Sequence, residues 1–326
     1  MAEARVLGFG TATLDYRIRT ADLGDCYTEK LLAQEVEVLG GGAIANCLVQ
    51  VSRLGGSAVW LGKLGKDRTA ETIVAQLQRE GVDCSRALYD PTLGSPFNLA
   101  VYAGLRRRRV GGYLIPGSLA CLSEADVSAL ATAVRSDDWV VVEIGEIPLD
   151  SVARFCREAK DRGARLAVDV DLDPLLQCGA DPRLVAEIFR LQNLIMANQR
   201  ALQSMYDLPT ARALTSRLGQ VFRAMTVVSA GEEGCYYSEL GGSAEHLPAI
   251  PVEVVDPVGA GDAFHGGLLY ALTEGQDFSQ SLEIARRSAA LNCTVFGARE
   301  GMPDGDALAR FNPEDPKQPQ SGGKEG

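Results

Sequence analysis

The chain of 326 residues is predicted to form a three-layer α/β/α fold on a mostly parallel sheet, with a small separate β-sheet. From about residue 122, short continuous apolar runs alternate with amphipathic helical runs, which is typical of a parallel sheet covered on both faces. Glycine-rich turns at 40–42 and 259–261 also separate strand-like from helix-like segments. The crossovers between the strands are expected to be right-handed.

Composition limits the classes of function. The net charge of −11 argues against nucleic-acid binding, and no apolar run approaches the roughly 20 residues of a membrane span. Two histidines nearly exclude a His-centred triad or a multi-His metal site. The eight cysteines are scattered and contain no C-x-x-C pair, so we expect reduced thiols and a cytoplasmic protein without a signal peptide.

The N-terminal part predicts the first strand of the main sheet and a small additional sheet. Residues 6–10 have the pattern of a buried strand, and 58–62 of another. Leu48, Val51 and Leu54 have helical spacing before Gly55, and Thr69 to Glu80 forms a helix that Gly81 ends. The small sheet is expected to draw its strands from about 16–20, 31–39, 97–103 and 109–115.

The C-terminal part completes one domain that spans residues 1–311. We expect strands at 139–144, 166–170, 194–197 and 226–229. Helices are expected at 123–135, 149–162, 184–191, 200–205, 210–222, 264–272 and 281–294. The tail from 312 to 326 has no apolar pattern and is predicted to be disordered.

The run from Val254 to Gly267 has the most informative pattern. Pro257 stops a strand, Gly259 and Gly261 permit a tight turn, and a helical pattern begins at Asp262. A helix N-terminus after a glycine turn binds anions, because free N–H groups and the helix dipole favour negative charge. Asp262 is either a simple N-cap or a carboxylate that takes a proton from a hydroxyl.

The run resembles the D-T-x-G-A-G-D signature of the ribokinase (PfkB) family of carbohydrate kinases, with Pro257 in place of the common Thr. The resemblance implies that Asp262 is the catalytic base. It also implies that the amides of Gly259, Ala260 and Gly261 form an anion hole for the transferred phosphoryl group.

A second resemblance lies near the N-terminus, in G-G-x-x-x-N followed by Arg53-Leu54-Gly55. In the family the glycine backbone approaches the sugar and the Asn binds a hydroxyl, which implies roles for Gly41, Gly42 and Asn46. Asp15 follows the first strand, where an Asp of the family binds two sugar hydroxyls. Its alternative role is a loop cap.

The nucleotide-binding residues are implied by Ser229-Ala230-Gly231-Glu232-Glu233-Gly234, which resembles the family's S/T-x-G-x-x-G turn. Asn198 matches the Asn of the family's N-x-x-E segment, but Ala201 replaces the Glu that organises Mg²⁺. Arg286 lies about where the family has an adenine contact.

Three further carboxylates and a histidine have less definite roles. Asp169, Asp171 and Asp173 lie where the family has D-x-N, without its Asn. Three carboxylates at alternate positions suggest a metal site as one alternative, but strand alternation favours the interpretation that two of them are loop caps. Asp256, the first Asp of the long signature, implies a monovalent cation site, with K⁺ as the ion. His265 is predicted to lie on a helix face beside the site.

The resemblance implies an ATP- and Mg²⁺-dependent kinase that phosphorylates a sugar primary hydroxyl beneath a lid formed by the small sheet. A nucleoside or sugar-phosphate acceptor remains an alternative, the latter if Arg106 to Arg109 bind phosphate instead of forming a solvated hairpin tip. A sugar-binding pseudokinase is a further alternative, because Ala201 and the missing D-x-N Asn weaken the site. The open lid edges make a homodimer through the lid plausible.

Overall fold

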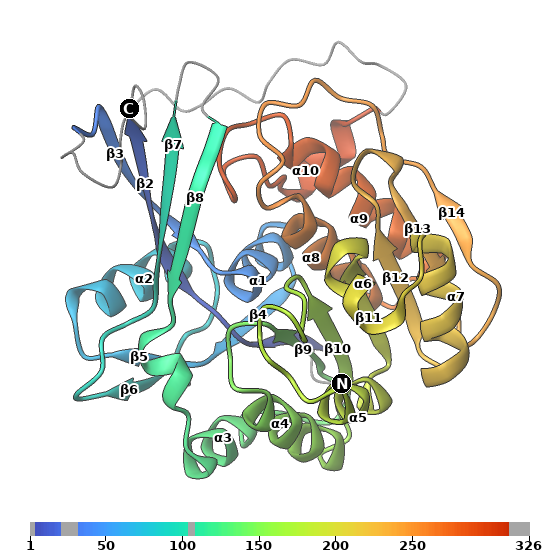
Figure 1. The fold of residues 1–326 in the computed structure, drawn as a ribbon, viewed down its shortest axis with the longest axis horizontal. Helices are drawn as coiled ribbons and strands as arrows, with labels where there is room; N and C mark the ends of the chain where they lie inside the picture. The colour runs from blue at the N-terminus through green and yellow to red at the C-terminus, as the bar shows by residue number, and fades with distance from the viewer. Residues whose placement is uncertain (1–3, 21–31, 104–107, 313–326) are drawn as a thin grey trace.

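The computed structural model describes residues 4–20, 32–103 and 108–312, which form a main sheet and a smaller second sheet (Figure 1). The main sheet has the order β14-β13-β12-β11-β10-β9-β1-β4, in which the strands from β12 to β4 pair in parallel and β13 pairs antiparallel with both β12 and β14. Its strands are β1 (Arg5–Phe9), β4 (Ser57–Leu61), β9 (Trp139–Ile144), β10 (Arg165–Val170), β11 (Leu194–Asn198), β12 (Met225–Ser229), β13 (Cys235–Ser238) and β14 (Glu245–Leu247). The predicted α/β fold with a mostly parallel sheet is confirmed.

Helices cover both faces of the main sheet because its strands are apolar on both sides. In β9, Trp139 and Val141 join one hydrophobic cluster, and Val140 and Val142 join the other. One cluster packs against α1 (Ala43–Arg53), α2 (Arg68–Arg79), α8 (Ala260–Thr273) and α9 (Phe278–Asn292). The other packs against α3 (Glu124–Ala131), α4 (Leu149–Asp161), α5 (Pro182–Leu191), α6 (Gln199–Tyr206) and α7 (Ala211–Phe222). The short α10 (Gly305–Arg310) lies beside α9.

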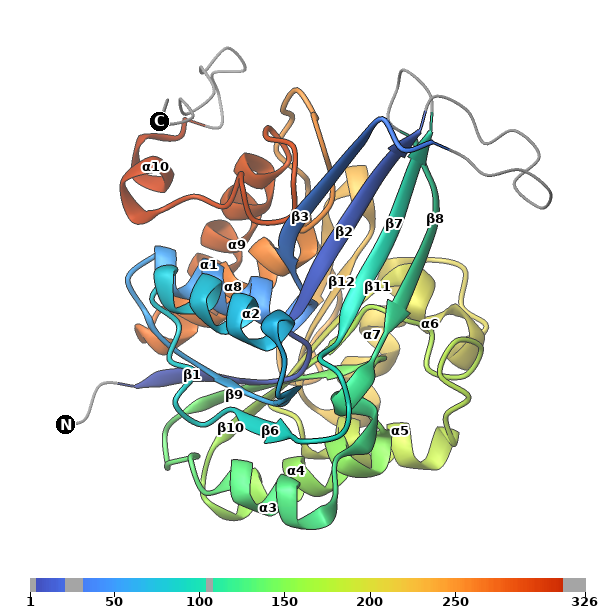
Figure 2. The ribbon, with the colours of Figure 1, turned by 90° about the vertical axis from the view of Figure 1, so that its left-hand side faces the viewer.

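The second sheet extends away from the main domain beside α1 and α2 (Figure 2). Its order is β3-β2-β7-β8, formed by β2 (Thr13–Thr20), β3 (Glu35–Gly41), β7 (Phe97–Ala103) and β8 (Arg108–Ile115). These strands lie close to the predicted segments, except that β3 begins at Glu35 and not near residue 31. We refer to this sheet as the lid sheet.

Several element boundaries differ from the sequence prediction. The helix expected at 123–135 ends at Ala131, and the helix expected from residue 281 begins at Phe278 because Asp277 accepts a hydrogen bond from the Gln280 N–H. The pair β5 (Lys63–Gly65) and β6 (Leu88–Asp90), the strands β13 and β14, and the helix α10 were not predicted. The predicted disordered tail lies, apart from Asn312, outside the described residues.

The fold places the starts of α1 and α8 together at the carboxyl edge of the parallel strands. Close approach of the two helices depends on Gly266, where a Cβ would lie 2.5 Å from the Cys47 carbonyl oxygen. This packing brings Asn46 of α1 next to Asp262 of α8, across 216 residues of sequence. Among the helices that the structure describes, none is long and apolar enough to cross a membrane.

Candidate active site

The first turn of α8 holds Asp262 at the carboxyl edge of the sheet. Gly259 caps the helix with a φ of 79°, and a Cβ there would lie 2.1 Å from the Ala298 carbonyl oxygen. The Ala260 N–H donates to the Pro257 carbonyl at 3.2 Å, whereas a Cβ on Gly261 would meet nothing within 4 Å. The turn is therefore tight at Gly259 and open beside Gly261.

The Asp262 carboxyl is in an environment that disfavours its charge. Burial raises its pKa to about 7, and the nearby carboxylates of Asp169 and Asp171 act in the same direction. The Asn46 Nδ2 group donates to Asp262 Oδ2 at 2.6 Å, which opposes the rise, as does the charge of His265. A carboxyl with a pKa near neutral pH is well matched to general base catalysis.

A buried arginine fixes the orientation of the Asn46 side chain. The Arg299 Nε group donates to Asn46 Oδ1, and its Nη2 group donates to the Gly41 carbonyl at 2.7 Å. Because the amide oxygen is taken by Arg299, the Asn46 NH₂ group must point to Asp262. Burial lowers the pKa of Arg299 to about 10, and the nearby charge of Asp15 opposes that shift.

Asp15 lies on β2 against the backbone of the glycine turn. Its Oδ1 accepts hydrogen bonds from Thr13 Oγ1 at 3.0 Å and from Asn98 Nδ2 at 2.8 Å. A Cβ at Gly41 would lie 2.1 Å from the same oxygen, so a side chain at this position would displace the Asp15 carboxylate. Gly42 has a φ of 92°, and a Cβ there would lie 2.6 Å from the Thr11 carbonyl oxygen.

Two carboxylates at the end of β9 belong to the same region but were not predicted. Glu143 accepts from the Thr11 N–H at 2.7 Å and from the Thr11 hydroxyl at 3.0 Å, and burial raises its pKa well above its usual range. Burial also raises the pKa of Glu146 to about 7, helped by the charges of Asp171 and Asp15. Glu146 Oε2 is buried and has no hydrogen-bond partner among the described residues. A polar atom of this kind suits a ligand hydroxyl.

The sequence predicts only that His265 lies on a helix face beside the site. In the structure, its side chain is also buried and forms an ion pair. Its Nδ1 atom lies 3.1 Å from Asp169 Oδ2, and both side chains are buried. Burial lowers the pKa of His265, but the Asp169, Asp262 and Asp171 charges outweigh this effect and raise it overall. A protonated His265 therefore offsets part of the negative charge around Asp262.

The prediction that two of Asp169, Asp171 and Asp173 are loop caps needs correction. Asp173 is a loop cap, since its Oδ1 accepts from the N–H groups of Leu175 and Leu176. Asp169 is buried within β10 and pairs with His265 instead. Asp171 follows the strand and accepts from Asn198 Nδ2 at 3.0 Å, and burial raises its pKa. Strand alternation failed here because Asp171 lies beyond the end of β10.

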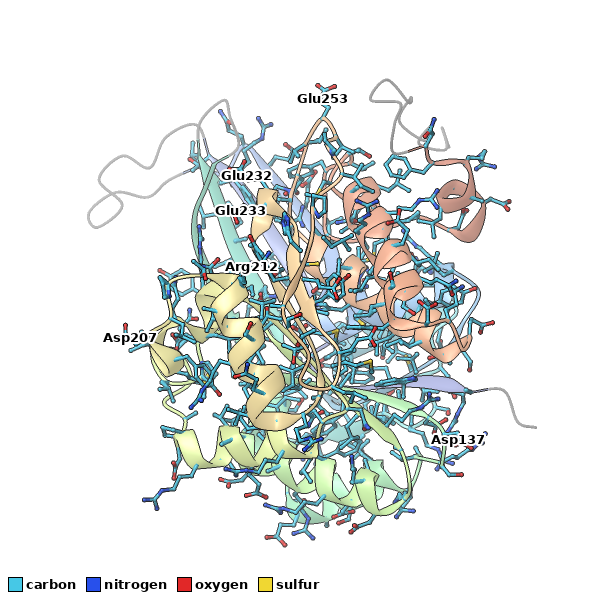
Figure 3. The ribbon with its side chains drawn as sticks, turned by 90° about the vertical axis from the view of Figure 1, so that its right-hand side faces the viewer. Asp137, Asp207, Arg212, Glu232, Glu233 and Glu253 are labelled. Atoms are coloured by element: carbon cyan, nitrogen blue, oxygen red, sulfur yellow. The ribbon has the colours of Figure 1, made fainter. Side chains whose placement is uncertain are left out.

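The turn after β12 holds the predicted nucleotide residues. Ser229 ends the strand, Gly231 has a φ of 63°, and Gly234 has a φ of 98° with no room for a Cβ beside the Leu247 carbonyl oxygen. Figure 3 shows Glu232 and Glu233 of this turn on the same side of the molecule as Glu253, which precedes α8. The turn thus lies at the carboxyl edge of the sheet.

The other two predicted nucleotide residues differ in their surroundings. Asn198 caps α6, accepting from the Ala201 N–H at 2.8 Å while its Nδ2 group donates to Asp171. Arg286 lies on α9, where it donates to Glu283 and, at 3.2 Å, to the Pro248 carbonyl. Among the described residues, the side-chain hydrogen bonds of Arg286 go to Glu283 and Pro248 and not to the residues around Asp262.

Asp256 precedes the glycine turn and is buried. Its Oδ1 accepts from the Val258 N–H at 3.1 Å, and its Oδ2 accepts from the Gly297 N–H at 3.1 Å. The guanidinium of Arg17 lies 3.9 Å from the same Oδ2. The predicted cation-binding carboxylate is therefore already engaged by two amides and a nearby positive charge.

Residues 3–305 match the model of the pfkB family of carbohydrate kinases. The chain is 26% identical to a ribokinase of Bacillus subtilis over 298 residues, which is 90% of this chain and 94% of the relative. It is 28% identical to an aminoimidazole riboside kinase of Salmonella typhimurium over 283 residues, which covers 83% of this chain and 87% of the relative.

The fold also matches solved structures. A ribokinase of Arabidopsis thaliana, complexed with ribose and ATP, is 20% identical, with a TM-score of 0.81 and coverage of 95% of this chain and 99% of that one. A nucleoside kinase of Burkholderia thailandensis, in complex with inosine, is 18% identical, with a TM-score of 0.75 and coverage of 93% and 95%. Since the family model spans nearly the whole chain, the protein belongs to the pfkB family and is an ATP-dependent carbohydrate kinase.

Proposed function

We propose that the chain transfers the γ-phosphoryl group of ATP to a primary hydroxyl of a sugar, with Asp262 as the general base. The observation that carries this proposal is the position of Asp262. It lies at the start of α8, accepts a 2.6 Å hydrogen bond from Asn46, and has a pKa raised to about 7. A carboxyl in this state is ionised often enough at neutral pH to accept a hydroxyl proton.

Each oxygen of the Asp262 carboxyl has a separate role in this mechanism. Asn46 donates to Oδ2, and Oδ1 takes the proton of the acceptor hydroxyl. Arg299 holds the Asn46 amide in the one orientation that supports this arrangement. Asp15 and Glu146 bind other hydroxyls of the acceptor, since Glu146 Oε2 lacks a partner among the described residues. Positioning the acceptor in this way lowers the entropic part of the barrier.

The glycine turn supplies the electrostatic part of catalysis. The amides of Gly259 and Gly261 and the positive end of the α8 dipole face the transferred phosphoryl group, with Ala260 contributing once its bond to Pro257 relaxes. The nucleotide lies along the turn from Ser229 to Gly234 and near Asn198. The lid sheet closes over the acceptor and excludes water, so that the acceptor hydroxyl receives the phosphoryl group.

The residues beside the glycine turn fit a magnesium ion that arrives with ATP. Asp171 offers carboxylate oxygens, and because burial and the Asp169 charge raise its pKa, a nearby cation would favour its ionised form. Asp171 would hold the ion through its waters, and Asn198 would orient the Asp171 carboxylate, in the absence of the Glu that Ala201 replaces. When bound, the ion neutralises charge on the phosphates.

A nucleoside is the second acceptor class that we consider, because one relative is an aminoimidazole riboside kinase. Its ribose would present a primary hydroxyl to Asp262 in the same way as a free sugar. The sugar-phosphate alternative depends on Arg106 to Arg109. Arg106 and Arg107 lie outside the described residues, so the structure adds nothing to that alternative.

We also propose that two lid sheets pack face to face in a homodimer. The lid has a row of directly paired residues, Val38–Tyr16–Leu99–Tyr113, across its four strands. Val38 and Tyr113 at the two ends of this row are exposed. The central residues Tyr16 and Leu99 are half-buried, and an apolar row that is exposed at both edges of the sheet favours contact with another protein surface.

The function is tested by measuring ADP release with ATP and Mg²⁺ over ribose, fructose, 2-keto-3-deoxygluconate, nucleosides and hexose phosphates. We expect strong turnover on one acceptor, and loss of that turnover in Asp262→Asn. The control Asp277→Asn makes the same change at the exposed N-cap of α9 and should keep full activity. Turnover that survives in Asp262→Asn would remove Asp262 as the base.

A further inference from the structure

Arg17 is a buried arginine that the proposed mechanism does not use. It follows Asp15 by two residues on β2, so both side chains lie on the face of the lid sheet that is turned to the main domain. Its side chain is only 3% exposed, and arginine is seldom buried without a partner. A negatively charged group nearby is therefore expected to stabilise the buried Arg17 guanidinium.

The surroundings of Arg17 point to Asp256 as that reason. Arg17 Nη1 lies 3.9 Å from Asp256 Oδ2, and the guanidinium stacks over the Phe296 ring with its central carbon 5.2 Å from the ring centroid. Glu37 lies opposite Arg17 in the β2–β3 register. Among the described residues, however, the carboxylate that lies within 4 Å of the Arg17 guanidinium is that of Asp256. Nη1 is buried and has no hydrogen-bond partner among the described residues, so its charge acts across space.

Several oxygens around Asp256 already accept hydrogen bonds, whereas Asn292 Oδ1 is buried and has no hydrogen-bond partner among the described residues. Both carboxylate oxygens accept backbone N–H groups, from Val258 and from Gly297. The Val258 carbonyl accepts from Asn292 Nδ2 at 3.0 Å, and the Cys293 carbonyl accepts from the Asp256 N–H at 3.2 Å. The carboxylate oxygens of Asp256 keep further lone pairs, so hydrogen bonding alone leaves room for a cation, but the Arg17 guanidinium 3.9 Å away repels a second positive charge. The residues present therefore do not fit the K⁺ site that the resemblance implies.

We propose that the Arg17 guanidinium replaces the monovalent cation at Asp256, so that this kinase works without K⁺. Arginine is charged at every pH that the protein meets, and a buried charge is little screened by salt. Asp256 begins the turn that leads to Gly259 and the proposed anion hole. Arg17 is thus a positioning residue that holds this turn and adds positive potential beside the transferred phosphoryl group.

Because Arg17 belongs to the lid sheet, movement of the lid affects both the acceptor site and Asp256. The same strand that carries Asp15 over the acceptor also carries the cation to Asp256. Closure of the lid and completion of the electrostatic site therefore occur together. A diffusible ion would not couple these two events.

The test compares activity in potassium and tetramethylammonium salts at equal ionic strength, and it rests on the proposed kinase activity. We expect the unmodified chain to show the same kcat in about 100 mM of either chloride. Arg17→Met should lose about tenfold in kcat in tetramethylammonium and regain most of it in potassium, as expected for loss of one charge near a helix N-terminus. Arg17→Lys keeps the charge and should remain independent of K⁺.

The matched control is Arg19→Met, two residues along the same strand, where the side chain is partly exposed and pairs with Glu35. This variant should stay independent of K⁺. Activation of the unmodified chain severalfold by K⁺ would overturn the proposal. Loss of activity in Arg17→Met that K⁺ does not restore would also overturn the proposal, since Arg17 would then act in another way. An Arg17→Met variant that behaves like the unmodified chain would overturn it as well.

A measurement of thermal stability in the two salts separates this proposal from the proposed function. The melting temperature of Arg17→Met should rise in KCl relative to tetramethylammonium chloride, and that of the unmodified chain should not. This difference requires no substrate. Absence of turnover on every acceptor would count against the kinase assignment alone, whereas a K⁺-specific rise in the unmodified chain would count against Arg17.

Discussion

The proposed catalytic role of Asp262 conflicts with the stability of the fold at this one residue. Burial and the Asp169 and Asp171 charges hold its pKa near 7, so the carboxyl is readily protonated in the folded chain. Asn46 and His265 limit this rise and keep the group within reach of neutral pH. His265 lies one turn along the same helix as Asp262, whereas Asn46 and the pair Asp169 and Asp171 come from distant parts of the sequence and are brought there by the fold.

The raised pKa of Asp262 predicts the pH dependence of turnover. The base must be ionised, so kcat/KM should rise with pH and level off above about 7. Initial rates between about pH 5.5 and 8.5 would show this limb. A rate that is constant down to about pH 5 would mean that a group with an ordinary carboxyl pKa, or no base at all, limits the reaction.

The same shift predicts that Asp262 lowers the stability of the fold. A carboxyl whose pKa is higher in the folded state than in the unfolded state stabilises the fold only while protonated, so this contribution is lost as pH rises towards about 7. Above pH 7, the free energy of unfolding of Asp262→Asn should therefore be about 1–3 kcal/mol higher than that of the unmodified chain. The difference should disappear near pH 4, as denaturant titrations at the two pH values would show. Equal stability at both pH values would contradict the raised pKa.

At the scale of elements, the start of α8 is the feature that the sequence predicts best. Pro257, Gly259 and Gly261 lie in one short run, and the turn and helix follow from local backbone preferences. The strand that Pro257 was expected to stop is not formed, since residues 251–256 are irregular. The partners of that turn could not be predicted in the same way. Arg299 contacts Asn46 across 253 residues, and no local pattern encodes such a contact. Glu143 could have been noticed, because it is a carboxylate inside the apolar run of β9.

The two glycines of this turn provide a matched pair of substitutions. Gly259→Ala should destabilise the fold by about 1–3 kcal/mol, because its φ is positive and a Cβ would clash with the Ala298 carbonyl. Gly261→Ala should fold at least as stably as the unmodified chain, since a Cβ there meets nothing. Its kcat/KM should nevertheless fall by about tenfold or more, because the methyl group enters the space proposed for the phosphoryl group. Full activity in Gly261→Ala, measured beside its melting temperature, would exclude this turn as the anion hole.

At the scale of the whole molecule, the parallel sheet and the lid sheet were predictable from hydrophobic periodicity, and the edges of the fold were not. The strands β13 and β14 are short and partly exposed, so their sequences lack the continuous apolar pattern of β9 to β11. The described cysteines Cys47, Cys84, Cys121, Cys156, Cys178, Cys235 and Cys293 form no disulfide with one another. Long-range pairing, of the kind that joins Arg17 to Asp256, was beyond periodicity altogether.

The lid row predicts the state of association. Val38→Glu combined with Tyr113→Glu should convert a dimer to a monomer, because it places charges on the apolar face of both edge strands. Val254→Glu is the control, since Val254 is also exposed but lies in the loop before α8. Sedimentation velocity over a range of concentrations would give the outcome. A chain that stays monomeric without any substitution would refute the lid dimer.

The central claim is that Asp262 removes the proton from the acceptor hydroxyl during phosphoryl transfer. The most direct test is a single-turnover measurement of phosphoryl transfer from ATP to the preferred acceptor, in the unmodified chain and in Asp262→Asn. The account predicts a rate constant lower by about a hundredfold to ten-thousandfold in the variant, with unchanged binding of ATP and acceptor by calorimetry. A rate constant within about threefold of the unmodified chain would show that another group acts as the base.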